Sequence, residues 1–91
     1  VVMASRGYPL APQSGDAITG LPPASEDTMV FHAATAWNGQ TLTTQGGRVL
    51  CVTALGSTVR AAQKQAYLGV QKIAFDGQQF RHDIGHLAIR N

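Results

Sequence analysis

The stretch Gly46-Gly47-Arg48-Val49-Leu50-Cys51-Val52-Thr53-Ala54-Leu55-Gly56 decides how this 91-residue chain folds. Two adjacent glycines allow the backbone to turn where a side chain would clash, and to approach a ligand or another segment closely. The apolar run that follows is short and bounded by glycines, which is typical of a strand buried on both faces. We therefore expect a central strand over residues 48–54, entered through a tight glycine turn.

Arg48 stands between the glycine pair and the apolar run. At the end of a rigid strand, a guanidinium offers a planar fork of N–H donors that suits a carboxylate or a phosphate. Gly46, Gly47 and Arg48 are therefore the candidate substrate-binding residues. The spacing alone favours a plainer alternative, a surface arginine that follows a hairpin turn.

The segments before the central strand predict an antiparallel meander. Residues 29–35 alternate, with Val30 and His32 on one face and Met29 and Phe31 on the other. The Asn-Gly pair at 38–39 is typical of a two-residue hairpin turn, and residues 40–44 return as a β-prone strand. The glycine pair then turns the chain into the central strand, while residues 1–4 form a further strand.

A helix is expected after the central strand, with Ser57 as its N-cap. Apolar residues recur there at spacings of three and four, which is typical of one helix face. The residues of this stripe are Val59, Ala62, Ala66, Val70 and Ile73. Lys72 suits the negative end of the helix dipole. The fold class is therefore α+β, a small antiparallel β-sheet with one long helix packed on it.

Composition and charge exclude several classes of partner. The chain is 44% hydrophobic and 13% charged, with a net charge of +2. Its seven basic residues are scattered and do not alternate with aromatic residues, so we expect no nucleic-acid partner. We find no signal peptide and no stretch long enough to span a membrane, so we expect a cytoplasmic protein.

The titratable residues suggest no metal or catalytic site. The single cysteine, Cys51, lies in the apolar strand and is expected to act as a small hydrophobic residue. Glu26 and Asp27 are neighbours on a polar turn, where both face water. His32 has no second ligand at metal-binding spacing and is expected to be a half-exposed strand residue.

His82, Asp83 and His86 crowd together near the end of the chain. A His-x-x-x-His spacing can place two imidazoles on one helix face, but Gly85 and the single nearby carboxylate weaken this metal-site interpretation. The same three residues define a hydrolase alternative, which would require activity from the isolated chain. Neither a G-x-S-x-G nucleophile elbow nor a phosphate-binding Walker loop is present.

Several motifs, in order, resemble the C-terminal domain of the phosphoribosylamine–glycine ligase (glycinamide ribonucleotide synthetase) family. They occupy residues 2–9, 15–16, 18–21, 30–33, 46–56 and 83–86, so the resemblance covers nearly the whole chain. Three positions differ from the residues usual in that family. Arg6 and Ala34 replace glycine, and Gln45 replaces asparagine.

The resemblance implies an ATP-grasp ligase of de novo purine synthesis, which joins 5-phosphoribosylamine to glycine through a glycyl phosphate. It also implies that ATP and Mg²⁺ bind to an ATP-grasp portion outside this chain. Residues 1–91 would then be a single C-terminal domain fragment that packs against this portion and helps to wall the substrate cleft. This agrees with the opening of the chain, where residues 1–4 already read as a strand with no initiator methionine.

Within that interpretation, Arg48 contacts the substrate phosphate or the glycyl carboxylate, and Tyr8 and His32 are weaker candidates for the same cleft. We expect no catalytic acid or base and no cofactor or metal ligand in these 91 residues. The rival class is a non-enzymatic interaction or scaffold domain in which the glycine turn is purely structural.

Overall fold

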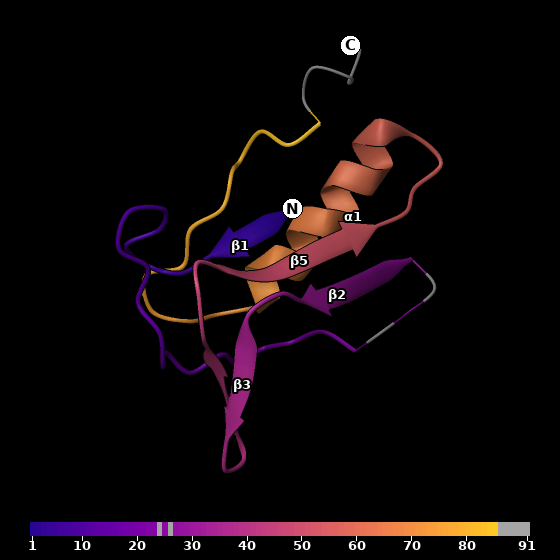
Figure 1. Cartoon of the computed structure of the whole chain (residues 1–91). Helices are drawn as coiled ribbons and strands as arrows, with labels where there is room; N and C mark the ends of the chain where they lie inside the picture. The colour runs from indigo at the N-terminus through magenta and orange to yellow at the C-terminus, as the bar shows by residue number, and fades with distance from the viewer. Residues whose placement is uncertain (24, 26, 86–91) are drawn as a thin grey trace.

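The computed structural model describes residues 1–23, 25 and 27–85. Within these residues, five strands and one helix form a three-stranded sheet with the helix packed on one face and a β-hairpin that extends away from the sheet (Figure 1). The elements are β1 (Val2–Ala4), β2 (Thr28–His32), β3 (Thr35–Asn38), β4 (Thr41–Thr44), β5 (Arg48–Ala54) and α1 (Val59–Lys72).

Strand β5 is the central strand of a three-stranded antiparallel sheet with the order β1-β5-β2. Val49, Leu50 and Val52 are fully buried, which confirms the predicted buried central strand. The second half of the strand differs from the prediction, because Thr53 is exposed and Cys51 is only half-buried. The sheet is therefore covered on one face and open on the other at this end.

The predicted meander is wrong in its pairing. Strands β3 and β4 do form the predicted hairpin, although its two loop residues are Gly39 and Gln40. Strand β5 does not pair with β4, however; it pairs with β2, which precedes the hairpin, and with β1. The predicted strand over residues 29–35 is broken between β2 and β3. Strands β2, β3, β4 and β5 therefore form one long β-ribbon that bends at this break.

The bend in this ribbon lies at a bulge that contains Gly46 and Gly47. The pairing continues on both sides of it, since Gln45 N–H donates to the Ala34 carbonyl (2.9 Å) and Ala33 N–H donates to the Val49 carbonyl (2.9 Å). Neither glycine has a positive φ, so the pair does not form the tight turn that the sequence suggested. Extra residues on one strand bend a ribbon and increase its twist.

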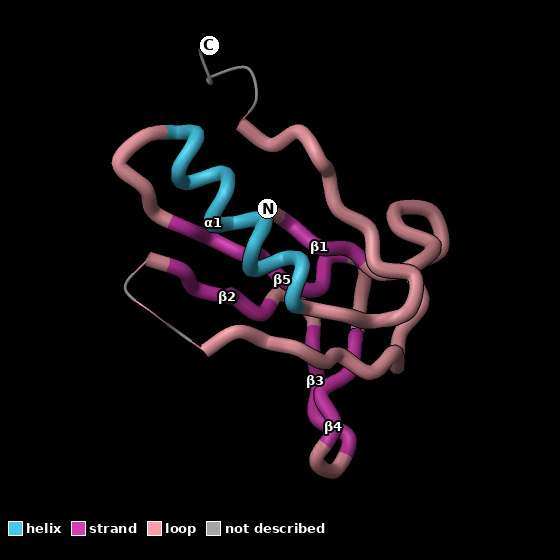
Figure 2. The backbone as a smooth tube through the Cα atoms, turned by 180° about the vertical axis from the view of Figure 1, so that it is seen from behind, coloured by secondary structure: helices cyan, strands magenta, loops and turns pink. Residues whose placement is uncertain are grey.

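The helix covers one face of the sheet (Figure 2). Its N-cap is Thr58 rather than the predicted Ser57, and the Thr58 hydroxyl accepts a hydrogen bond from Ala61 N–H (3.0 Å). A Cβ atom at Gly69 would lie 2.9 Å from Val52 Cγ1, so a glycine allows the close contact between helix and strand. Lys72 lies in the last turn, as predicted.

Between the helix and the sheet lies one hydrophobic core. Its fully or nearly fully buried members come from β1, β4, β5, α1 and the segments beside them: Met3, Ile18, Leu42, Val49, Leu50, Val52, Val70, Ile73 and Phe75. The extended segment around Ile18 joins it through bridges from Ala17 to Thr43 and from Thr19 to Ala74. No helix of the described residues is long and apolar enough to cross a membrane.

Replacing Leu50 with alanine tests the central position of β5. Leu50 is fully buried, so Leu50→Ala should lower the free energy of unfolding by about 2–5 kcal/mol. Leu68→Ala is the control, because the Leu68 side chain is 43% exposed and its loss should cost at most about 1 kcal/mol. Denaturant titration measures both values, and equal losses would contradict the assignment of the core.

Candidate functional site

Arg48 is the first residue of β5 and is exposed. Within the described part of the chain, its guanidinium makes no ion pair and no side-chain hydrogen bond. Its neighbour across the sheet is Ala4, whose small side chain leaves the guanidinium uncovered. Arg48 is thus a cation whose donors are available to an external anion.

Two open hollows meet at Arg48. The first has a volume of about 540 Å³ and is lined by the loop after β1, the bend of the ribbon and the start of β5. The second, of about 450 Å³, lies between β1 and the segment around Phe80. Val2, Tyr8 and Arg48 line both hollows, which together we call the Arg48 cleft.

Gly47 lies directly beneath the ring of Tyr8. A Cβ atom at this position would lie 2.5 Å from Tyr8 Cδ2, which is far inside van der Waals contact. The Gly47 carbonyl accepts a hydrogen bond from Ser5 N–H (2.8 Å), so the bulge is joined to the end of β1. The glycine therefore serves close packing, and this packing places Tyr8 beside Arg48.

The structure brings together only two of the three predicted substrate-binding residues. Gly47 and Arg48 line the cleft, whereas Gly46 is not among its lining residues. A Cβ atom at Gly46 would lie 3.0 Å from the Cβ atom of Ala34, so this glycine makes room inside the bend. Within the described residues, neither glycine N–H donates to another backbone group.

The loop that carries Tyr8 is held by an ion pair with Arg6. The Arg6 guanidinium donates to both carboxylate oxygens of Asp16, at 3.1 and 2.8 Å. The Asp16 side chain is 9% exposed, and Asp16 N–H also donates to the Thr44 hydroxyl (3.1 Å). The ion pair thus closes the loop from 6 to 16 beside the cleft.

The segment after the helix forms the opposite wall of the cleft. Gln79 pairs with Ala4 through two backbone hydrogen bonds (2.7 and 2.9 Å), which extends the sheet beyond β1. This pairing places Phe80 and Arg81 on the cleft. The Arg81 guanidinium donates to both oxygens of Asp83 (3.0 and 2.9 Å), and these bonds raise the pKa of Arg81 above its ordinary value.

Sequence reasoning did not single out Arg81 as a site residue. Its motif, Arg81-x-Asp83, is visible in the sequence and is compatible with a local ion pair. Its place beside Arg48 depends on the pairing of Gln79 with Ala4, which lies 75 residues earlier (79 minus 4). A pairing over such a distance leaves no local signal in the sequence.

Of the two weaker candidates for the cleft, Tyr8 lines both hollows, whereas His32 does not line either. His32 lies at the end of β2, where its Nδ1 is 2.9 Å from the Thr35 hydroxyl, and it does not line the cleft. The His82 ring packs against the Phe80 ring at a tilt of 47°, with ring centroids 4.6 Å apart. Cys51 lines one hollow. Glu26 and His86 lie outside the described residues.

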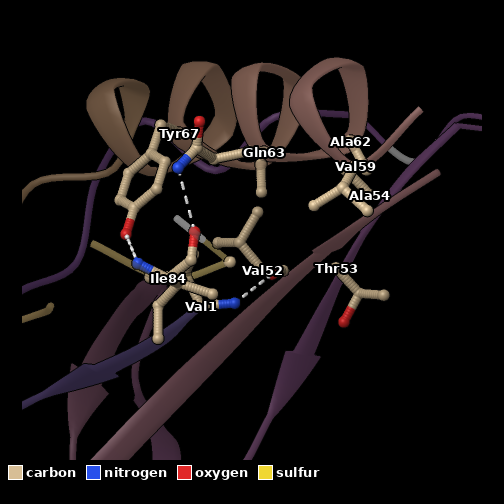
Figure 3. Close-up of a pocket in the computed structure, with 11 residues that line it drawn as sticks. Val1, Val52, Thr53, Ala54, Val59, Ala62, Gln63, Tyr67 and Ile84 are labelled. Carbon is tan, nitrogen blue, oxygen red and sulfur yellow. Dashed lines mark hydrogen bonds between the residues drawn. The ribbon is translucent and has the colours of Figure 1, made fainter. Parts of the chain in front are cut away.

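A further pocket lies between the first half of α1 and β5 (Figure 3). It has a volume of about 240 Å³. Two hydrogen bonds of 3.0 Å close one side: the Gln63 side-chain amide donates to the Ile84 carbonyl, and Ile84 N–H donates to the Tyr67 hydroxyl. The described residues that line it carry no charged side chain. It therefore suits an anion less well than the Arg48 cleft does.

The donor set also limits what the described residues can bind. Among them, no three His, Cys, Asp or Glu side chains are grouped so as to hold a metal ion. The cleft offers guanidinium and amide donors beside aromatic and apolar walls. The fold and the cleft together define a small α+β domain with an exposed guanidinium on an open cleft.

Comparison with known proteins identifies the family. Residues 1–87 match the family model described as phosphoribosylglycinamide synthetase, C domain, and the chain belongs to this family. It is 57% identical over 90 residues to a phosphoribosylamine–glycine ligase from Ralstonia nicotianae and 50% identical over 91 residues to one from Neisseria meningitidis. These alignments cover 99% and 98% of this chain but only 21% of each relative.

A solved structure agrees with this assignment. The crystal structure of phosphoribosylamine–glycine ligase from Thermotoga maritima matches with a TM-score of 0.79 and 43% identity. The match covers 91% of this chain and 20% of that chain. The chain therefore spans about a fifth of the relatives it matches, and it corresponds to their C-terminal domain.

The contact between Gly47 and Tyr8 can be tested by a double-mutant cycle. Gly47→Ala should destabilise the domain by about 1–3 kcal/mol, because the new methyl group would overlap the Tyr8 ring. The loss should be smaller in a Tyr8→Ala background, since the overlapping ring is then absent. Chemical denaturation of the four proteins measures the coupling, and strictly additive losses would show that the two residues do not meet.

The ion pair between Arg6 and Asp16 provides a second cycle. Arg6→Ala should lower the free energy of unfolding more in the unmodified chain than in an Asp16→Asn background. In the unmodified chain the substitution leaves the buried Asp16 carboxylate without its cation. We expect a coupling of about 1 kcal/mol, because Arg6 is about half exposed. Thermal unfolding at neutral pH measures it, and zero coupling would reject the role of this pair.

Proposed function

We propose that this chain is the C-terminal domain of an ATP-grasp phosphoribosylamine–glycine ligase of purine biosynthesis. The ligase would join 5-phosphoribosylamine and glycine to form glycinamide ribonucleotide, with hydrolysis of ATP to ADP and phosphate. The family match supports this proposal, as do the names of the relatives. The observation that carries a role for this domain is the unpaired Arg48 guanidinium on an open cleft.

In this proposal the chain supplies binding rather than proton transfer. ATP and Mg²⁺ would bind in the ATP-grasp portion, since the described residues of this chain do not form a carboxylate group that suits a metal ion. Glycine would be activated as glycyl phosphate, and the amine of 5-phosphoribosylamine would then displace phosphate. Such chemistry relies on positioning and on cationic stabilisation of anions.

Arg48 would bind an anionic substrate group at the edge of the domain. The phosphate of 5-phosphoribosylamine and the glycyl carboxylate both match the fork of guanidinium donors. The N–H group of Gly47, one residue before Arg48 on the same cleft, can add a donor to the same anion. Tyr8 would then form one wall of the cavity that the ATP-grasp portion completes.

The hydrolase alternative has less support in the structure. Asp83 is bound by Arg81 through two hydrogen bonds, and the His82 ring packs against Phe80, so neither is arranged as a base beside a nucleophile. The full ligase would act in the cytoplasm with glycine, 5-phosphoribosylamine and ATP as substrates. A non-enzymatic scaffold domain stays possible only if the gene encodes no ATP-grasp region before these residues.

Replacing Arg48 in the full-length ligase tests this proposal. A charge-assisted hydrogen bond is worth about 1.5–3 kcal/mol, so Arg48→Ala should lower kcat/KM by roughly tenfold to a hundredfold. Arg48→Lys should retain part of the activity, because it keeps the charge but loses the fork of donors. Steady-state kinetics with each substrate varied in turn would show which anion Arg48 contacts.

Lys64→Ala is the matched control, because Lys64 is an exposed cation on α1 that does not line the cleft. Its kinetics should equal those of the unmodified enzyme. If Arg48→Ala folds normally and also keeps normal kinetics, Arg48 is not part of the substrate site.

A further inference from the structure

Tyr67 on α1 joins the helix to the segment that follows Gln79. Its hydroxyl donates a hydrogen bond to the Arg81 carbonyl and accepts one from Ile84 N–H (3.0 Å), so the hydroxyl is used both as a donor and as an acceptor. One turn earlier on the same helix face, the Gln63 amide donates to the Ile84 carbonyl (3.0 Å), as Figure 3 shows. We call Gln63 and Tyr67 the α1 clasp.

The α1 clasp holds a segment that the sheet does not hold. The pairing of Gln79 with Ala4 is the last contact of this segment with the sheet, and no backbone-to-backbone hydrogen bond joins the described residues after Gln79 to the rest of the described chain. The Phe80 ring lies beside the Tyr67 ring, with centroids 6.3 Å apart. The position of residues 81–84 on the domain therefore depends on their hydrogen bonds with side chains of α1.

This segment carries the second cation of the Arg48 cleft. Arg81 and Arg48 line the same hollow of about 450 Å³. Asp83 accepts two hydrogen bonds from the Arg81 guanidinium, but it lies only two residues away on the same segment. This ion pair therefore orients the guanidinium relative to its own segment, and the position of the segment on the domain is left to the α1 clasp.

The separation of the two guanidinium groups thus depends on Tyr67. Arg48 has a fixed place because it begins the central strand β5, whereas Arg81 reaches the cleft through the clasped segment. An anion held by two cations needs both in place at once, because charge-assisted hydrogen bonds depend on distance and direction. When a binding arrangement is populated for only a fraction of the time, the apparent affinity falls by that fraction.

We propose that Tyr67 is a positioning residue of the ligase: its hydroxyl fixes the segment that carries Arg81, so that Arg81 and Arg48 bind the same substrate anion. This inference rests on the proposed function. Tyr67 does not itself line the Arg48 cleft, so its effect on the substrate passes through Arg81.

Tyr67→Phe in the full-length ligase tests the proposal, because it removes the hydroxyl and keeps the ring that packs beside Phe80. Hydrogen exchange of the peptide that contains residues 81–84, followed by mass spectrometry, should become faster by roughly fivefold or more. The KM for the substrate that Arg48 binds should rise by roughly threefold to tenfold, with kcat within about twofold, because the loss concerns binding.

Two glutamines of α1 provide matched variants. Gln63→Met removes the second bond of the α1 clasp and should change the exchange rate and the same KM in the direction of Tyr67→Phe. Gln65 lies in a different hollow beside Pro22 and Pro23, so Gln65→Met should change neither. In an Arg81→Ala background, Tyr67→Phe should have no further effect on KM, because Tyr67 acts through Arg81.

Each failure has a separate signature. Unchanged exchange in Tyr67→Phe would overturn the proposal, because the hydroxyl would not hold the segment. Faster exchange with an unchanged KM would also overturn it, since Tyr67 would then be purely structural, and so would a full Tyr67→Phe effect in the Arg81→Ala background. If Arg48→Ala changes the kinetics and Tyr67→Phe does not, this inference fails and the proposed function stands. Normal kinetics of a folded Arg48→Ala would reject both.

Discussion

The close contact at Gly47 is the constraint on which the arrangement of the candidate site depends. Tyr8 packs where a Cβ atom of residue 47 would otherwise be, and the Gly47 carbonyl binds Ser5 N–H. Through these contacts the bend of the β-ribbon, the end of β1 and the loop after it meet at one point. Arg48 follows immediately and begins the central strand, so its exposed side chain is attached directly to this contact.

The sheet of the domain has one covered face, one open face and the Arg48 cleft at the end of the open face. One face of the sheet holds α1 and the hydrophobic core, with Gly69 permitting a close approach to Val52. The other face is apolar and open, and the Arg48 cleft lies at its end. Such a division suits a domain that is stabilised by its own core and contributes a cationic edge to a larger active site.

Local signals predicted the elements well but not all of their partners. The apolar run of β5, the hairpin near Gly39 and the helix after β5 each depend on neighbouring residues, and all three were recognised from the sequence. The predicted helical stripe holds only in part, because Val59 is 46% exposed and Ile73 lies just beyond the end of α1. The pairing of β5 with β2 was missed, because the glycine pair suggested a turn and not a bulge. The helix cap was misplaced by one residue because Ser57 and Thr58 are both good caps. Arg81 was missed because only the distant pairing of Gln79 with Ala4 brings it to the cleft.

The central claim is that the Arg48 guanidinium binds a substrate anion in a cavity completed by the rest of the ligase. A crystal structure of the full-length enzyme with 5-phosphoribosylamine or glycine bound tests it most directly. The account predicts a guanidinium nitrogen of Arg48 within about 2.7–3.2 Å of a phosphate or carboxylate oxygen, in a cleft enclosed on both sides. An Arg48 side chain that extends into bulk solvent, away from both substrates and from the domain interface, would contradict it.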